Sequence, residues 1–242
     1  MGRLTGRVNL TQEQRPGSIF VPIHWNGQFA SQARVDTLVA PITDPISGQP
    51  ESKHTPVNVR PFLPRWHGFI LSRQPLSLTE TAYWVKVKGQ QFWRYELAGE
   101  NWVEQPLEWI QNLTEQQGEW LEFSDQRAGR YRAANILDNQ LQTVMFLAAD
   151  HHLPERGWLS QLFTEETLDG AARQSLLAGR PGPGQQDKGK MVCACFGVGE
   201  TTIKDTIRQG EAKSVEDIGR CLKAGTNCGS CIPELKQLLA NS

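Results

Sequence analysis

Apolar side chains in the middle of the chain follow the spacing of half-buried β-strands. In residues 83–88 a tyrosine and two valines alternate with a tryptophan and two lysines, the period of two that a strand requires. Gly89–Gln90 separates this segment from QFWRYEL, which predicts a β-hairpin with glycine at the first turn position. YRAANIL and QLQTVMFL flank Asp138–Asn139 and predict a second hairpin.

The apolar spacing becomes helical after residue 151. Trp158, Leu159, Leu162 and Phe163 stand at i, i+1, i+4 and i+5, which places them on one face of a helix. The sequence EETLDGAARQSLLAG then predicts a second helix that ends at Gly179.

Residues 191–242 predict three short helices. The first, ETTIKDTIRQG, ends at Gly210, and the second, SVEDIGRCLKAG, has Ser214 as its N-cap and ends at Gly225. The third has Pro233 in its first turn and carries three leucines. This helical hairpin is expected to bring the two ends of the segment together.

Four parts follow from these patterns, and they predict the α+β class. Residues 1–60 are rich in Val, Ile, Thr, Pro and Gly and predict short strands joined by long loops. Residues 61–178 are β-rich, carry most of the tryptophans, and become helical at their end. Glycine and proline make residues 179–190 a linker, and residues 191–242 form a small helical domain.

Composition narrows the class of protein. The net charge of −1 argues against a nucleic-acid partner, and the longest apolar stretch, residues 144–149, is too short to span a membrane. The odd number of five cysteines and the lack of a signal peptide argue against a disulfide scaffold. Reduced thiols and a cytoplasmic location are therefore expected.

All five cysteines lie after residue 192. Cys193 and Cys195 form one pair, Cys228 and Cys231 form the other, and thirty-two residues separate the pairs. A structural zinc site usually has C-x(2–4)-C at both ends, whereas the first pair here is the tighter C-x-C. An iron–sulfur cluster needs four thiolates from loops and backbone amides that donate to sulfur, so this spacing favours a cluster and leaves zinc as the alternative.

The neighbours of these cysteines suit a cluster. Gly197, Gly199, Gly225 and Gly229 allow backbone to come close to a bound group because they have no Cβ. Cys221 follows Ile218 at i+3 on the predicted second helix, so we expect it to be a buried small hydrophobic residue.

The tail resembles a known family of iron–sulfur domains. VCACF, followed after about thirty residues by AGTNCGSC, is similar to the bacterioferritin-associated-ferredoxin-like [2Fe-2S] domain over about residues 191–240. The resemblance implies that Cys193, Cys195, Cys228 and Cys231 bind the cluster, and Cys221 has no place in the family's pattern.

The front of the chain resembles a second family. RPGSIFVPIHW and DPISGQPESKHTPVNV are similar to the end of the molybdopterin-dinucleotide-binding domain of bacterial molybdenum oxidoreductases, in the assimilatory nitrate reductase branch. The implied fold is part of a six-stranded double-psi β-barrel, whose loops cover the cofactor, here molybdopterin guanine dinucleotide with molybdenum.

This resemblance implies cofactor contacts. His24 and Trp25 stand in the family's cofactor-facing HW loop, and Lys53 matches a lysine that would offset phosphate charge. Asp36 stands where the family commonly has an asparagine, and a carboxylate lacks the amide's donor.

The resemblance also implies a function in a larger enzyme. The chain is expected to be the C-terminal portion of an assimilatory nitrate reductase, which reduces nitrate to nitrite. It would cap the molybdopterin and relay electrons from a flavoprotein or ferredoxin through the [2Fe-2S] cluster. No cysteine precedes residue 193, so a [4Fe-4S] site and any cysteine ligand of molybdenum are expected from the remainder of the catalytic subunit, either in a longer chain or in a separate partner. We assign no catalytic residue here.

Two alternatives from other classes stay open. One is a non-catalytic iron–sulfur protein that docks a partner or transfers electrons, and the other is a structural module held together by zinc. Iron and sulfide content would separate a cluster from zinc, and reduction by a donor would separate electron transfer from docking.

Overall fold

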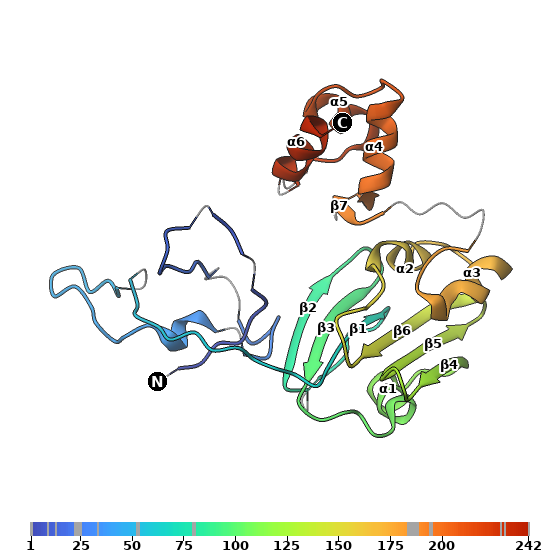
Figure 1. Cartoon of the computed structure of the whole chain (residues 1–242), viewed down its shortest axis with the longest axis horizontal. Coiled ribbons are helices and arrows are strands. Elements are labelled where there is room, and N and C mark those ends of the chain that lie inside the picture. The colour runs from blue at the N-terminus through green and yellow to red at the C-terminus, as the bar shows by residue number, and fades with distance from the viewer. Residues whose placement is uncertain are drawn as a thin grey trace.

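The computed structural model shows a sheet with a loop-rich front segment on one side and a small helical tail above α2 (Figure 1). It describes the whole chain apart from residues 1, 9, 13, 22–25, 33, 52–53, 79–80, 183–188, 194–195, 228, 230 and 242.

The sheet has six strands in the order β2-β3-β1-β6-β5-β4. Every neighbouring pair is antiparallel. The strands are β1 (Trp66–Ser72), β2 (Tyr83–Lys88), β3 (Trp93–Gly99), β4 (Glu119–Asp125), β5 (Arg130–Leu137) and β6 (Gln140–Ala148). The α+β class predicted from the sequence is confirmed.

Both predicted hairpins form, but only one has the predicted turn. In β5–β6, Leu137 pairs with Gln140, so Asp138 and Asn139 make a two-residue turn with φ of 50° and 58°. In β2–β3 the last pair is Lys88 with Trp93, so four residues form the connection.

The prediction of glycine at the first position of a two-residue turn in β2–β3 was therefore wrong. The left-handed residue of this connection is Gln91, with φ of 63°. Gly89 accommodates Phe92 instead, because a Cβ at Gly89 would lie 2.4 Å from the Phe92 ring. Contact with an aromatic ring, rather than turn chemistry, accounts for this glycine.

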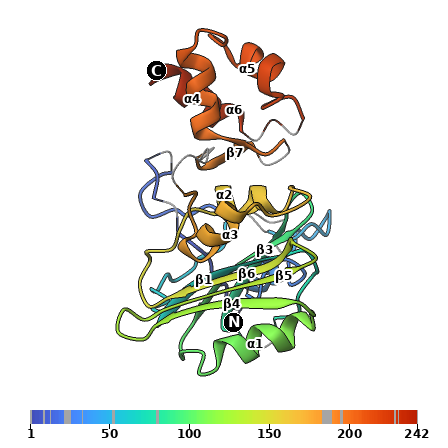
Figure 2. The same cartoon turned by 90° about the vertical axis from the view of Figure 1, so that its right-hand side faces the viewer.

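Helices cover both faces of the sheet, as Figure 2 shows. α2 (Arg156–Leu162), α3 (Gly170–Ser175) and the 3-10 helix η2 (Leu176–Ala178) pack on one face. The four apolar residues that predicted α2 are all buried there, and the following helical segment ends at Gly179 in a left-handed conformation, as predicted. Sequence and structure agree on this layer except at the start of the second helix, which begins at Gly170 rather than at the preceding EETLD.

The opposite face is covered by α1 (Pro106–Thr114), which the sequence reading did not predict. Its signal was present, because Pro106 occupies the first turn and Leu107, Ile110 and Leu113 recur every three residues. This short helix lies between two strands, β3 and β4, and was not separated from them in the sequence pattern.

The front segment, residues 1–63, extends beside the sheet (Figure 1), and among its described residues only Ala30 is buried. Its described residues contain the 3-10 helix η1 (Val35–Leu38) and isolated bridges, Ala30 to Val85 and Thr43 to Pro50. The described residues of this segment contain no β-strand beyond these bridges, so the partial double-psi barrel stays a prediction. The segment meets the sheet edge where Ser31 N donates to Trp84 O at 2.9 Å.

The tail is built from short elements around a separate core. These are β7 (Met191–Cys193), β8 (Val198–Gly199), α4 (Glu200–Arg208), α5 (Val215–Leu222) and α6 (Ile232–Ala240). Half of the predicted linker, residues 183–188, lies outside the described part of the chain. Across the described residues, no helix has the length and apolar content needed to cross a membrane.

Candidate metal centre

The tail folds as its sequence predicts at most helix ends. Ser214 caps α5, its side chain accepting a hydrogen bond from Asp217 N at 3.1 Å. The Asp217 carboxylate reaches back and accepts from Lys213 N at 3.1 Å, which satisfies a second donor at the helix start. α5 ends at Leu222 with Lys223 in the left-handed region, three residues before the predicted Gly225.

This fold brings together one cysteine from each predicted ligand pair. Cys193 ends β7 and Cys231 precedes α6, and both are buried in the same apolar core with Ile203, Ile218 and Leu235. The two thiols are neighbours in this core, and burial followed by the nearby Cys193 raises the pKa of the Cys231 thiol. Two residues that are 38 positions apart in the sequence are therefore in contact, as the predicted helical hairpin requires.

The surroundings of Cys231 fit a metal-bound sulfur. Burial raises the pKa of its thiol, and the neighbouring Cys193 raises it further. The backbone N–H groups of Gly225 and of Cys231 itself act in the opposite direction, because they donate to the sulfur and favour the thiolate. Two thiolates this close would need a cation to offset their repulsion, which a cluster iron would supply.

Three of the four glycines near the cysteines have left-handed backbone. The φ angles of Gly197, Gly225 and Gly229 are 63°, 85° and 72°. Side chains rarely adopt these angles, so glycine lets both cysteine loops bend sharply around the site. Gly199 instead has φ of −94° and stands at the N-cap of α4.

The other two predicted ligands, Cys195 and Cys228, lie outside the described residues. Over the part of the chain that is described, no three His, Cys, Asp or Glu side chains converge as a metal site. The four-cysteine set is represented in the structure by the Cys193–Cys231 contact.

The expectation that Cys221 is buried was wrong. Cys221 is exposed, and its sulfur lies 3.7 Å from the carbonyl oxygen of Glu211. The buried face of α5 is formed by Ile218 and the adjacent Gly219, and Cys221 falls beside that face. The position of Cys221 three residues after the buried Ile218 was therefore not enough to place its side chain in the core.

The predicted molybdopterin contacts are only partly within the described residues. His24, Trp25 and Lys53 lie outside them. Asp36 lies in η1, is exposed, and forms an ion pair with Arg34 at 3.2 Å. Its charge is thus offset by a neighbour two residues away, and its predicted role toward a cofactor stays a prediction.

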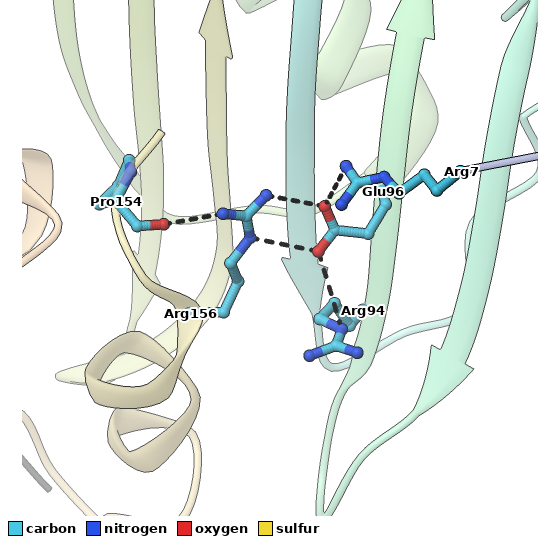
Figure 3. A network of polar contacts seen from close by, with 5 residues as sticks. All are labelled: Arg7, Arg94, Glu96, Pro154 and Arg156. Atoms are coloured by element: carbon cyan, nitrogen blue, oxygen red, sulfur yellow. Dashed lines mark hydrogen bonds and ion pairs between the residues drawn. The ribbon is translucent and has the colours of Figure 1, made fainter. Parts of the chain in front are cut away.

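The sequence reading missed a charged network that joins distant segments (Figure 3). The Glu96 carboxylate accepts two hydrogen bonds from Arg156, at 3.2 and 2.7 Å, and one from Arg7 at 3.0 Å. Arg94 lies 3.8 Å from the same carboxylate. These residues come from β3, the start of α2 and the front segment, so no local spacing could have indicated their contact.

Comparison with known proteins supports both predicted resemblances. The BFD-like [2Fe-2S] binding domain matches residues 191–241, and the Molydopterin dinucleotide binding domain matches residues 1–56. A nitrate reductase of Klebsiella oxytoca is 38% identical over 242 residues, which are 99% of this chain. The chain is homologous to part of a nitrate reductase. It spans about a quarter, 27%, of that relative's length.

Further relatives of this nitrate reductase homologue share shorter regions. The assimilatory nitrate reductase electron transfer subunit of Bacillus subtilis is 27% identical over 121 residues, which are 49% of this chain and 15% of that protein. The nitrogen fixation protein NifU of Leptolyngbya boryana is 31% identical over 55 residues, 23% of this chain and 27% of that protein. No solved structure matches the chain significantly.

The two family matches identify the cofactors of the nitrate reductase homologue. A [2Fe-2S] cluster belongs to the tail, and a molybdopterin dinucleotide belongs to the front segment. The chain therefore carries binding regions for an electron-transfer group and a molybdenum cofactor.

Proposed function

We propose that this chain is the portion of an assimilatory nitrate reductase that covers the molybdopterin guanine dinucleotide and relays electrons to it. When bound, the cluster supplies one-electron transfer and the molybdenum cofactor supplies the site at which nitrate is reduced to nitrite. The chain's own residues bind both groups and hold them in one polypeptide. The rest of the catalytic machinery would come from the remainder of the catalytic subunit.

The contact between Cys193 and Cys231 carries the proposal. Both thiols are buried in one apolar core, where burial and the neighbouring Cys193 raise the pKa of the Cys231 thiol and backbone N–H groups act to lower it. Cys195 is two residues from Cys193, and Cys228 is three residues from Cys231, so a ligand set of four needs only these two loops. We therefore assign Cys193, Cys195, Cys228 and Cys231 as the cluster ligands.

Apolar exposure supports the proposed role of the front segment. Most of the large hydrophobic side chains that are exposed among the described residues lie in this segment: Val8, Leu10, Ile19, Phe20, Phe29, Ile42, Ile46, Val57, Val59 and Leu63. Apolar surface on this scale is typical of a segment that packs against another polypeptide. The proposed partner is the rest of the molybdopterin-binding domain, with which the segment would complete a double-psi barrel.

The proposed cofactor contacts follow from that arrangement. His24 and Trp25 would line the cofactor, Lys53 would offset phosphate charge, and Asp36 would replace the asparagine common in the family. The electron donor would be a flavoprotein or a ferredoxin. A cytoplasmic location is proposed because an odd number of cysteines argues against a disulfide scaffold.

Iron analysis of the purified chain tests the cluster. We expect visible absorption and about two irons and two acid-labile sulfides per chain. Cys193→Ser and Cys231→Ser should each lose most of the iron, whereas Cys221→Ser, which removes the exposed thiol, should retain it. A colourless chain with one zinc would contradict the proposal, and full iron in the Cys231→Ser protein would contradict the ligand assignment.

Reduction distinguishes electron relay from a docking role. The oxidised chain should accept one electron from a reduced flavoprotein or ferredoxin and lose visible absorption. Added to a reductase that lacks this portion, it should restore donor-dependent nitrate reduction, and Cys231→Ser should not. Restoration by the cluster-free variant would instead favour a docking protein.

A further inference from the structure

The first turn of α2 comes into close backbone contact with the end of the linker, immediately before the tail begins at residue 191. A Cβ at Gly157 would lie 2.4 Å from the carbonyl oxygen of Gly189, which is too close for any side chain. Gly189 in turn lies against the start of α4, because its own Cβ would be 2.5 Å from the Thr201 hydroxyl. Gly189 is thus enclosed between α2 of the sheet domain (residues 61–178) and α4 of the tail (residues 191–242).

Further contacts occur close to this point. A Cβ at Gly197, two residues after Cys195, would lie 3.9 Å from the amide oxygen of Gln90 in the β2–β3 connection. Lys190 forms an ion pair with Glu234 of α6 at 2.7 Å, which raises its pKa, and Glu155 at the N-cap of α2 adds a smaller effect in the same direction. Gly189, Lys190 and Gly197 surround the first cysteine pair in sequence, so the cysteine-bearing end of the tail faces the sheet domain. Both views show β7 next to α2 (Figures 1 and 2).

The same turn of α2 is also joined to the front segment. Arg156 precedes Gly157, and its guanidinium forms two hydrogen bonds with Glu96, which also accepts from Arg7 (Figure 3). Arg156 further donates to Pro154 O at 3.0 Å and lies over the Phe69 ring at 4.3 Å. A guanidinium with these partners is tightly positioned.

We propose that the first turn of α2, Arg156–Gly157, is the docking site for the cysteine-bearing end of the tail and sets its position relative to the front segment. Because Gly157 has no Cβ, the backbone at Gly189 can lie against it. Arg156 binds Glu96, which also binds Arg7, so the same turn is joined to the front segment. The proposal rests on the proposed function in that the docked end would carry the cluster. Gly157, Arg156 and Glu96 are then positioning residues for electron delivery.

Limited trypsin digestion of the whole chain tests this docking site. The Lys188–Gly189 bond adjoins the enclosed glycine and should be protected while the tail is docked. Gly157→Ala should increase the rate of cleavage at this bond about fivefold or more, because the added Cβ overpacks the contact and raises the open population. Gly170→Ala is the matched control, since Gly170 also lies in the first turn of a helix but has open space around its Cα.

Two further measurements keep the outcome interpretable. Tryptophan fluorescence must show that the sheet domain of Gly157→Ala is folded, and equal cleavage of folded Gly157→Ala, Gly170→Ala and the unaltered chain would overturn the proposal. Small-angle X-ray scattering of the unaltered chain needs no variant. A single compact arrangement is expected, and two independently moving bodies would overturn the proposal.

Iron and sulfide analysis of the same samples separates the two proposals. A chain without iron that still protects the Lys188–Gly189 bond would contradict the cluster and retain the docking site. A chain with full iron and an unprotected bond would contradict the docking site and retain the cluster.

Discussion

Glu96→Gln is expected to weaken the contact between three segments of the chain. The substitution preserves the shape of the side chain and one acceptor oxygen but removes the charge. Arg156 then loses its counter-charge, and its side chain is only 18% exposed, beside a Glu96 side chain that is 14% exposed. Arg7 also loses its partner, but it is 58% exposed and water can replace much of that interaction.

The magnitude follows from burial. Removing one partner of a fully buried ion pair costs about 3–5 kcal/mol. Partial exposure and the remaining glutamine oxygen reduce this, so we expect the free energy of unfolding of the sheet domain to fall by about 2–3 kcal/mol. For a domain of this size, the melting temperature should fall by roughly 6–12 °C.

Tryptophan fluorescence during guanidinium denaturation measures this loss in the right part of the chain. Residues 61–150 hold six of the eight tryptophans and residues 191–242 hold none, so fluorescence reports the sheet domain, while visible absorption reports the tail. Glu119→Gln is the control, because Glu119 pairs with Arg173 but is 56% exposed. It should cost less than about 1 kcal/mol. Equal losses for Glu96→Gln and Glu119→Gln would refute the reasoning from burial.

Two further predictions concern the tail and the tyrosines. Ser214→Ala should destabilise the tail by about 1 kcal/mol through loss of the α5 cap, seen as cluster absorption lost at a lower temperature, and Ser214→Asp should restore it. Burial raises the pKa of Tyr83, Tyr95 and Tyr131, the chain's three tyrosines, above the usual 10. Because a raised folded pKa contributes stability below pH 10 that is lost as the pH rises further, tyrosinate absorption should appear together with unfolding. A titration centred near pH 10 while fluorescence stays native would contradict this expectation.

The sequence was informative wherever a contact is local. The period of two in residues 83–88, the Asp138–Asn139 turn and the helical face at Trp158 each depend on residues a few positions apart. Their outcome in the structure matches because backbone geometry alone relates such neighbours. The turn at Gly89 and the burial of Cys221 failed for the opposite reason, since packing against Phe92 and the orientation of α5 decided them.

By itself, the sequence determined most of the sheet and tail elements and the thiol chemistry of the tail. It separated a thiol-free body from a tail with four cysteines at cluster spacing, because residue type and short-range spacing carry that information. Only the tertiary structure decided which other distant groups meet: Glu96 with Arg156 and Arg7, and Gly157 with Gly189. Such contacts depend on how whole elements pack, and no short window of sequence holds both partners.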